Sequence, residues 1–402
     1  MNEWRKVKLK ELITYASRGI TPKYSETSEG IIVLNQKCIR NQKLNLSESR
    51  LHADYLKKVS LEKIIQKYDI LINSTGVGTL GRICQNNLNV KMTVDSHITI
   101  IRPDINKIDP IFLGYSLKNQ QSFIENLGEG STGQTELKKD RLINEIEIKF
   151  PLNIGLQKKI SKILSDIDNK IELNNKINNN LEEQIQVLFS KWLSNNFKFS
   201  NKVTLEEVCS KITDGSHFSP KDNSLSSIPM LSVKDMEKFD FNLKSCKHIS
   251  ETDYQKMLMN DCVPKINDIL VAKDGSYLKE IFICNEERRI AILSSIAIFR
   301  PNLKKIYPEI LLAFLKSPNL LKEVRDNYVS GSALPRIVLR DFKKLSFYLP
   351  SIEIQSEISS LFYSIRKQIA KNIMENEKLI NLKNYLLPKL MNGEIDVKNI
   401  EL

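Results

Sequence analysis

Two glycine-rich stretches in the first half of the chain have spacings associated with nucleotide binding. Gly76 to Gly81 reads Gly-Val-Gly-Thr-Leu-Gly, a literal GxGxxG. A dinucleotide-binding fold also needs a helix after the glycines and an acidic residue about 20 positions further on. Here Arg82-Ile83-Cys84 follows and predicts another strand. The stretch is therefore interpreted as a tight turn between two strands.

Gly128 to Thr135 resembles the phosphate-binding loop of ATPases. It reads Gly-Glu-Gly-Ser-Thr-Gly-Gln-Thr, so Gln134 stands where a lysine would have to reach the phosphates. It also follows a predicted helix, whereas a P-loop follows a strand. Both departures argue against ATP binding by this stretch.

Two carboxylates, Asp104 and Glu147, could be arranged as a PD…ExK nuclease site because they stand in the sequences Pro-Asp and Glu-Ile-Lys. Their separation is wide, and the second half has Asn302 and Ser346 at the corresponding positions. A stand-alone DNA nuclease therefore stays open only as an alternative.

Histidine and cysteine spacings predict no metal site. The six cysteines form no CxxC pair, which predicts reduced thiols. The four histidines share no ligand-like spacing, and no Asn-Pro-Pro-Tyr or Asp-Pro-Pro-Tyr for amino-methyl transfer is present. We therefore expect neither a catalytic centre nor a bound metal. The residues concerned are Cys38, Cys84, Cys209, Cys246, Cys262, Cys284, His52, His97, His217 and His248.

Composition is that of a soluble protein with an excess of positive charge. The chain has 402 residues, room for two or three domains, with 41% hydrophobic and 27% charged residues. Sixty Lys and Arg against 48 Asp and Glu give a net charge of +12, which favours a polyanionic partner. The N-terminus lacks an apolar signal core, and no apolar stretch approaches the roughly 20 residues of a membrane span. We expect a cytoplasmic protein.

The elements of the chain repeat at an offset of 196 to 201 residues, about half its length. Such a register is not expected by chance over nearly half the chain. The paired segments are 7–13 and 203–209, the loops 17–24 and 214–221, the apolar runs 31–34 and 228–231, the runs 69–72 and 268–271, the stretches 101–104 and 299–302, the predicted helices 110–126 and 308–327, and the segments 130–132 and 331–333.

A long amphipathic helix is predicted after Pro151. Apolar residues recur every three or four positions from Ile160 to Trp192, and neither Pro nor Gly interrupts them. The helix would have about 37 residues from Leu156 and a length of roughly 55 Å. A helix of that length needs a partner.

Residues 350–390 repeat the same design and supply the partner. Gln355 and Ile358 follow Pro350 as Gln157 and Ile160 follow Pro151. The predicted fold is mixed α/β, with two tandem globules and two long helices that pair as an antiparallel coiled coil in a pseudo-two-fold internal repeat. The predicted segments are 1–150, 151–197, 198–349 and 350–402.

The ordered set of these pieces resembles the specificity subunit of type I restriction-modification systems, over essentially the whole chain. The pieces are Trp4 to Leu9, Asp268 to Val271, Gly130-Ser131-Thr132 leading to Phe150-Pro151-Leu152, Gln157 to Ile160 leading into Ile163 to Asp168, and Leu386 to Ile395. One departure is Gly331-Ser332-Ala333, where the family usually has another small polar residue. A second is the Asn-rich centre of the first helix, which would either loosen the coil or favour one register. Its members are Asn174, Asn175, Asn178, Asn179 and Asn180.

The resemblance implies a DNA-recognition subunit without catalytic activity of its own. Each globule would be a target-recognition domain that reads one half of a split DNA sequence, and the helices would set the spacer. The resemblance also implies partners: modification (methyltransferase) subunits that carry S-adenosylmethionine, and restriction subunits that translocate DNA and use ATP and Mg. No cofactor is expected on this chain.

Candidate DNA-binding residues are polar or basic side chains in the loops of the two halves, because such side chains reach base edges and phosphates. These loops differ strongly between the halves, so we expect an asymmetric target. In the first half they are Arg18, Thr21, Lys23, Tyr24, Asn73, Ser74, Thr75, Arg82, Thr132, Gln134, Thr135, Lys138, Lys139 and Arg141; in the second half they are His217, Ser219, Lys221, Lys273, Asp274, Ser276, Tyr277, Ser332, Arg336 and Arg340.

Extra apolar residues on the long helices predict surface for a docked protein. They are Phe189, Trp192, Leu193, Tyr385, Leu386 and Leu387. A protein-binding coiled-coil scaffold without DNA affinity is a further alternative.

Overall fold

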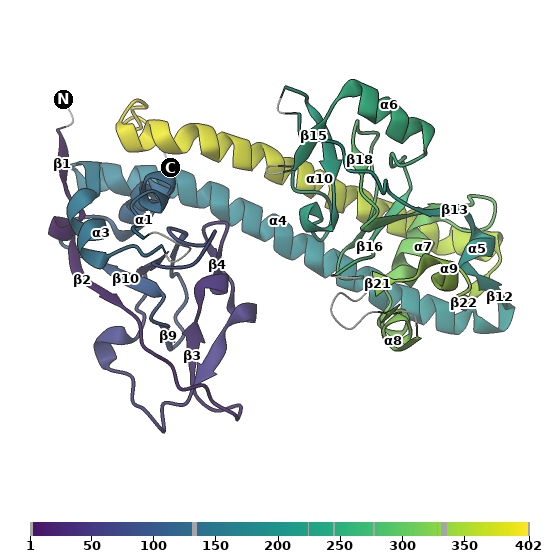
Figure 1. The fold of residues 1–402 in the computed structure, drawn as a ribbon, viewed down its shortest axis with the longest axis horizontal. Helices are drawn as coiled ribbons and strands as arrows, with labels where there is room; N and C mark the ends of the chain where they lie inside the picture. The colour runs from purple at the N-terminus through teal and green to yellow at the C-terminus, as the bar shows by residue number, and fades with distance from the viewer. Residues whose placement is uncertain are drawn as a thin grey trace. The chain divides into compact units, whose positions relative to one another are not determined.

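The computed structural model divides into two compact units (Figure 1). Unit 1 comprises Met1–Ile171 and Lys378–Leu402, and unit 2 comprises Glu172–Glu377. The structure describes residues 3–130, 135–223, 225–243, 246–275, 278–327, 329–330 and 336–400. No helix within these described ranges is long and apolar enough to cross a membrane.

Unit 1 is built on a four-stranded antiparallel sheet with strand order β2-β10-β7-β8. A smaller sheet has the order β6-β3-β9, and β1 pairs with β11. Its strands are β1 (Trp4–Lys8), β2 (Ile13–Arg18), β3 (Ile31–Leu34), β4 (Ile39–Arg40), β5 (Lys43–Leu44), β6 (Arg50–His52), β7 (Ile70–Asn73), β8 (Ile83–Gln85), β9 (Met92–Val94), β10 (Ile98–Pro103) and β11 (Glu147–Pro151). Its helices are α1 (Pro110–Asn119), α2 (Gln121–Glu125), α3 (Lys139–Glu145) and the beginning of α4 (Ile154–Asn195).

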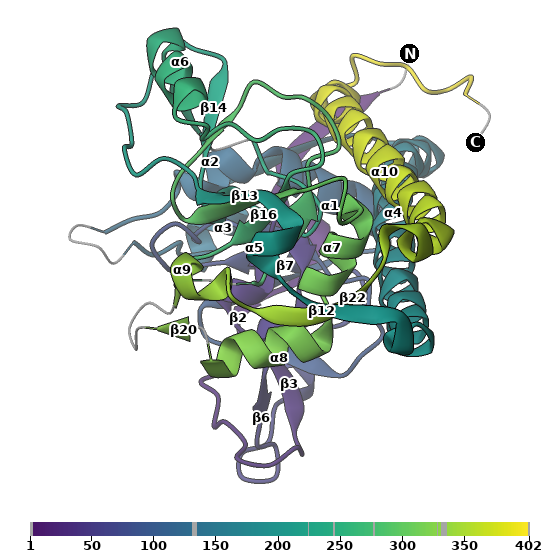
Figure 2. The same ribbon diagram turned by 90° about the vertical axis from the view of Figure 1, so that its right-hand side faces the viewer.

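Unit 2 has the same strand orders, β13-β19-β16-β17, β15-β14-β18 and β12 with β22. Figure 2 shows β12 and β22 side by side. Its strands are β12 (Ser200–Thr204), β13 (Cys209–Asp214), β14 (Ile228–Leu231), β15 (Lys247–Ile249), β16 (Ile269–Ala272), β17 (Ile281–Ile283), β18 (Ala291–Ile292), β19 (Ile296–Pro301), β20 (Val329–Ser330), β21 (Arg336–Ile337) and β22 (Ser346–Pro350). Its helices are α5 (Leu205–Val208), α6 (Glu251–Met259), α7 (Pro308–Leu315), α8 (Pro318–Asn327), α9 (Leu339–Phe342) and most of α10 (Ile352–Asn392).

The central sheet of each unit is buried on both faces. In β7, Ile70 and Ile72 join the core formed with α1 and α4, whereas Leu71 joins the core beneath the smaller sheet. In β16, Ile269 and Leu270 divide in the same way. Because both faces are covered, these strands read as continuous apolar runs instead of alternating ones.

One fully buried glutamine fastens the first turn of each long helix to its unit. Gln157 accepts a hydrogen bond from Asp109 N at 2.7 Å and donates one to Pro151 O at 2.8 Å. Gln355 accepts from Tyr307 N at 3.2 Å and donates to Pro350 O at 2.9 Å. The glutamines paired by the sequence repeat thus satisfy buried backbone groups that a helix start leaves open.

The two predicted long helices are present, and both were bounded closely. Helix α4 has 42 residues and begins two positions before the predicted Leu156, and α10 has 41 residues. The shorter helices predicted over 110–126 and 308–327 are each divided in two. Pro318 causes the second division, because a proline cannot continue the hydrogen bonding of α7.

Residues 76–81 form the predicted tight turn. They connect β7 and β8, which pair antiparallel, and no helix follows the glycines. Gly76, Gly78 and Gly81 all have positive φ angles, of 102°, 68° and 79°. The glycine pattern therefore serves a turn and not a dinucleotide.

Candidate nucleic-acid interface

Three predicted binding segments of unit 1 meet at one end of the central sheet. Ser74, after β7, donates its N–H to His97 O at 2.7 Å and accepts at its own carbonyl from Leu137 N at 2.8 Å. Arg18, at the end of β2, donates to Leu137 O at 3.1 Å and pairs with Glu136 at 2.6 Å. Segments 18–24, 73–82 and 135–141 therefore form one polar surface.

Unit 2 brings its three segments together by equivalent contacts. Lys273, after β16, donates its N–H to Ser295 O at 2.9 Å and accepts at its carbonyl from Ile337 N at 3.1 Å. Its ammonium group pairs with Asp214, at the end of β13, at 2.6 Å. Asp214 occupies the position of Arg18, so equivalent sites carry opposite charges.

Three candidates lie inside the protein and cannot contact DNA directly. Asn73 and Ser74 are fully buried, because the turn folds them against β10 and the 36–38 segment. Lys273 is buried, and its ammonium group forms an ion pair with Asp214. The prediction of direct contact with DNA is therefore corrected for these three residues. They instead connect the segments that carry the surface.

The early loop of unit 1 is exposed and held from beneath by His52. Thr21, Lys23 and Tyr24 are exposed. The buried His52 accepts from Lys23 N at 3.0 Å through Nδ1, and its Nε2 lies 2.7 Å from Lys57 O. The Arg50 guanidinium lies 3.4 Å from the centre of the Tyr24 ring. This loop is well placed to present a cation and an aromatic ring.

The basic residues of segment 135–141 are paired with acids of the same surface. Glu129 binds Lys138 at 2.7 Å and Arg141 at 3.0 Å, and Lys138 lowers the pKa of Glu129. Arg141 also pairs with Glu145 at 2.5 Å. A phosphate that binds here must compete with these exposed carboxylates. Lys139 is exposed beside Asp140, Thr135 is half-buried, and the half-buried Arg82 donates to Gly78 O at 2.7 Å.

The remaining candidates of unit 2 lie at the edge of its surface. His217 and Lys221 are exposed, and Ser219 is exposed and accepts from Lys247 at 2.9 Å. Asp274 is half-buried, and Arg340 is exposed next to Asp341. Thr132, Gln134, Ser276, Tyr277 and Ser332 lie outside the described residues, and Arg336 is described only by its backbone in β21.

Gln36 and His97 were not among the predicted DNA-binding residues, but both belong to the unit 1 surface. Thr75 Oγ1 lies 2.7 Å from Nδ1 of the exposed His97 and accepts from Gln36 Nε2 at 2.7 Å. No local pattern predicts this cluster, because its members are far apart in sequence. Comparison of the two halves could have drawn attention to His97, because the equivalent residue in the second half is Ser295.

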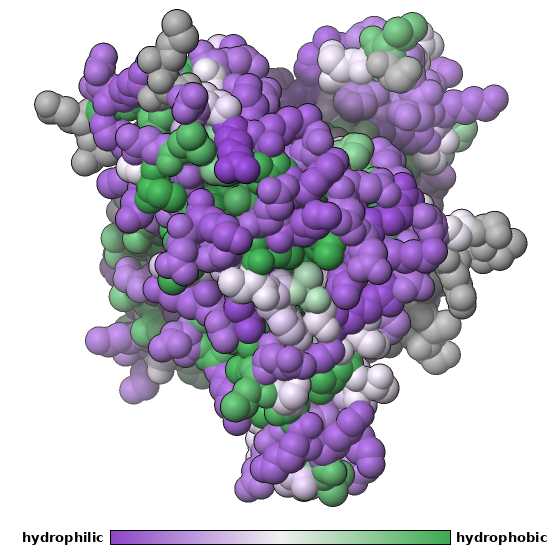
Figure 3. Space-filling model, turned by 90° about the vertical axis from the view of Figure 1, so that its left-hand side faces the viewer, coloured by the Kyte–Doolittle hydropathy of each residue, from purple (hydrophilic) through white to green (hydrophobic). Residues whose placement is uncertain are grey.

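Most of the predicted docking residues are internal. Phe189 and Trp192 are buried in the core of unit 2, and Leu387 is buried in the core of unit 1. The prediction of a docking surface is therefore wrong for these three, because the helix faces that carry them cover their own sheets. Leu193 and Leu386 are partly buried against the same cores, and Tyr385 is 58% exposed. On the face drawn in Figure 3, hydrophobic residues of the described part form small groups among hydrophilic ones.

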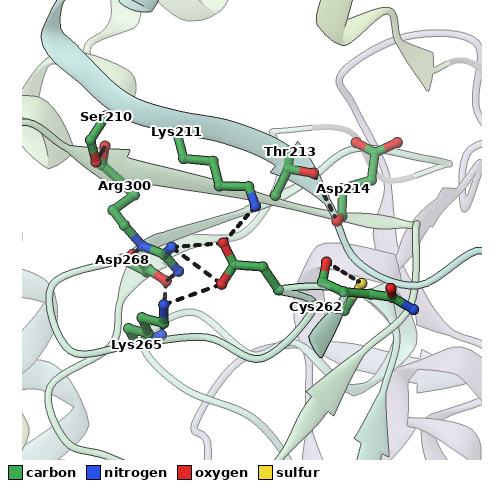
Figure 4. A network of polar contacts seen from close by, with 10 residues as sticks. Ser210, Lys211, Thr213, Asp214, Cys262, Lys265, Asp268 and Arg300 are labelled. Atoms are coloured by element: carbon green, nitrogen blue, oxygen red, sulfur yellow. Dashed lines mark hydrogen bonds and ion pairs between the residues drawn. The ribbon is translucent and has the colours of Figure 1, made fainter. Parts of the chain in front are cut away.

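An arginine bound to a buried aspartate fixes the central sheet of each unit at the end opposite the polar surface. In unit 2, Arg300 holds Asp268 through two hydrogen bonds of 2.8 Å. Arg300, Lys211 and Lys265 also converge on Asp261 (Figure 4), and their hydrogen bonds outweigh burial to lower the pKa of Asp261 to about 2. In unit 1, Arg102 holds Asp69 at 2.9 and 2.8 Å.

The family model of the type I restriction modification DNA specificity domain matches residues 1–183 and 199–382, so the chain belongs to this family. It is 22% identical over 470 residues to the type I restriction enzyme HindI specificity subunit of Haemophilus influenzae, with 98% of this chain and 100% of that protein covered. It is 26% identical to the type I restriction enzyme MjaIX specificity subunit of Methanocaldococcus jannaschii, with 89% and 84% covered. The fold is similar to that of a type I restriction-modification S subunit from M. genitalium, with a TM-score of 0.52, 17% identity, and 97% and 96% coverage.

Proposed function

We propose that this chain is the DNA sequence-recognition subunit of a type I restriction-modification complex. The observation that carries the proposal is the polar surface at the equivalent place in each unit. Family membership supplies the substrate class, and the net charge of +12 suits a polyanion. Each surface would read one half of a bipartite DNA target, with base contacts from exposed polar side chains and phosphate contacts from lysines and arginines.

The chain would contribute sequence choice and assembly without catalysis of its own. Asp104 pairs with Lys107 at 3.3 Å, whereas Glu147 pairs with Lys6 and Lys8 of β1. These carboxylates share no hydrogen bond or ion pair within the described residues. The nuclease alternative is therefore not favoured, and a scaffold without DNA affinity leaves the two polar surfaces unexplained.

The long helices would pair antiparallel and set the spacing of the half-sites. Asp168 binds Lys383 at 2.7 Å in unit 1. In unit 2, Asn174 donates to Asn376 at 2.9 Å, and Asn372 donates to Asn178 at 2.7 Å. The residue numbers rise on one helix as they fall on the other, as an antiparallel pair requires. Buried amides at such an interface favour one register, which supports the second interpretation of the Asn-rich centre.

A disulfide tests the register. Asn178→Cys with Asn372→Cys should form a cross-link on mild oxidation, detected by peptide mass spectrometry. Asn179→Cys with Asn372→Cys is the matched control, because Asn179 is exposed and binds Lys238. Equal cross-linking of both pairs would contradict a fixed register.

The partners would supply the chemistry. Modification subunits that carry S-adenosylmethionine would methylate the DNA, and restriction subunits that use ATP and Mg would translocate and cleave it. Tyr385, exposed on α10, is the candidate docking residue that remains on the surface.

The deciding experiment is co-expression with a neighbouring methyltransferase-like gene, followed by mapping of adenine methylation in host DNA by single-molecule sequencing. A bipartite motif that depends on both genes is the expected result. A stable complex that methylates no motif would overturn the proposal and favour the scaffold.

A further inference from the structure

Gln36, Thr75 and His97 form a hydrogen-bonded chain that ends at the exposed surface of unit 1. Gln36 Nε2 lies 2.6 Å from Thr75 O and 2.7 Å from Thr75 Oγ1. Thr75 Oγ1 lies 2.7 Å from His97 Nδ1. Asn73 donates from Nδ2 to Gln36 O at 3.1 Å, which holds the first member in place.

Hydrogen-bond polarity assigns a direction to this chain. A backbone carbonyl only accepts, so the Gln36 atom beside Thr75 O must be the amide nitrogen. That nitrogen also donates to Thr75 Oγ1, and the hydroxyl hydrogen then needs an acceptor. Among the described residues, His97 Nδ1 is the only acceptor within hydrogen-bond distance of that hydroxyl. If Nδ1 accepts this hydrogen, the neutral imidazole carries its own hydrogen on Nε2.

The backbone conformation near Gln36, Thr75 and His97 leaves room for their hydrogen bonds. Gly76 has a φ of 102°, and a Cβ at this position would lie 2.7 Å from Gln36 Nε2. His97 N donates to Asp95 Oδ1 at 2.9 Å, which fixes the turn that carries the ring. His97 is exposed, and its Nε2 has no partner among the described residues.

We propose that His97 is a base-reading residue of unit 1, whose Nε2–H donates to an acceptor on a base edge. This inference rests on the proposed function and names one contact within it. In the major groove guanine offers N7 and O6, adenine N7 and thymine O4, whereas cytosine offers a donor at N4. A fixed donor therefore excludes cytosine at one position of the half-site that unit 1 reads.

In unit 2 the position of His97 carries a serine hydroxyl, which can donate or accept, in place of a ring nitrogen. Val233, Asp274 and Ser295 stand at the positions of Gln36, Thr75 and His97, and Val233 N donates to Ser295 Oγ at 3.1 Å. The contact through Nε2–H therefore belongs to one half-site only.

The test compares variants in the complex with modification subunits. The wild-type complex should exclude cytosine at one position of one half-site. His97→Ala should lower discrimination at that position by about tenfold or more, the usual range for one base contact. It should leave the other half-site and the thermal stability unchanged. Lys91→Ala, at an exposed residue of unit 1 that is not among the candidate DNA contacts, is the control and should leave both half-sites unchanged.

A second pair of variants separates the hydrogen-bond chain from general packing. Thr75→Val removes the hydroxyl and should weaken discrimination, whereas Thr75→Ser keeps it and should retain discrimination. Nitrogen-15 NMR of the His97 ring should show the Nε2–H tautomer in the wild type and in Thr75→Ser, and a mixture in Thr75→Val.

The outcomes distinguish this inference from the proposed function. If the wild-type complex methylates no motif, the proposed function fails. If a motif appears and His97→Ala leaves both half-sites unchanged, the function stands and the inference is overturned. An Nδ1–H tautomer in the wild type would overturn it as well.

Discussion

Lys118 is a half-buried cation of unit 1. Its ammonium group lies 4.9 Å from the centre of the Tyr115 ring, and Asp168, Lys383, Lys43 and Cys84 act on it electrostatically. Burial lowers the pKa of Lys118 to about 8, and the neighbouring Lys383 contributes to the decrease, while Asp168 opposes it. The surroundings of Lys118 therefore disfavour its charged form relative to water.

Lys118→Met should raise the stability of the chain at pH 7. The folded pKa is below the unfolded value of 10.5, so the unfolded state binds more protons between about pH 8 and 10.5. The cost of burial is fully present below pH 8 and disappears as the pH rises to 10.5. At pH 7 the free energy of unfolding of the variant should be about 1–3 kcal/mol higher than that of the wild type. The increase in stability of the wild type between pH 8 and 10.5 should be absent from the variant.

Urea unfolding between pH 7 and 10.5 checks this prediction. Lys91→Met, on an exposed loop, is the matched control and should behave as the wild type does. Parallel pH curves for Lys118→Met and the wild type would contradict the prediction.

Arg300 compensates a fully buried carboxylate, Asp268. Arg300→Met should therefore lower the free energy of unfolding by about 3–5 kcal/mol, because it leaves Asp268 charged and without its partner. Arg300→Met combined with Asp268→Leu should recover part of the loss. Fluorescence can isolate this effect, since Trp192 lies in the core of unit 2 and the other tryptophan, Trp4, packs against that of unit 1.

Unfolding of Arg300→Met is best followed in a Trp4→Phe background, which leaves Trp192 as the probe. Arg102→Met, which removes the partner of Asp69 in unit 1, is the matched control and should leave the Trp192 transition in place. A loss below 1 kcal/mol for Arg300→Met would show that Asp268 does not depend on this ion pair.

At the scale of elements, the first turn of each long helix depends on one glutamine. Gln157→Ala should destabilise unit 1 by about 2–4 kcal/mol, because it leaves Asp109 N–H and Pro151 C=O buried without partners. Gln355→Ala should have the corresponding effect in unit 2. Hydrogen exchange should show faster opening at the start of α4 in the first variant and of α10 in the second. If either variant affects both starts equally, the anchors do not act locally.

Helices and strands were predicted correctly from the sequence where a local pattern of apolar residues or glycines marks them. The strands β3, β7, β14 and β16 were recognised as apolar runs, and the turn after β7 as glycine-rich. Helix α4 was predicted from its three-and-four spacing. The division of the predicted helix 110–126 was missed, because no proline or glycine marks the break at Gln120.

At the scale of the whole molecule, the two polar surfaces carry different groups. Arg18, Thr75 and His97 in unit 1 correspond to Asp214, Asp274 and Ser295 in unit 2. Different donors and acceptors read different bases, so we expect an asymmetric target. Replacement of residues 1–150 by those of a relative should change one half of the methylated motif and leave the other half unchanged. A palindromic target, or a change in both halves, would contradict this expectation.

The amino-acid sequence by itself determined the repeat, the mixed α/β class, the two long helices and the family resemblance, because these depend on periodicity and on local propensity. Burial and partner choice were decided only by the tertiary structure. It turned Asn73, Ser74 and Lys273 inward, placed Phe189 and Trp192 in a core, and brought Gln36 and His97 to Thr75. The physical reason is that a loop residue's exposure depends on which distant segments fold against it, and no spacing along the chain records that contact.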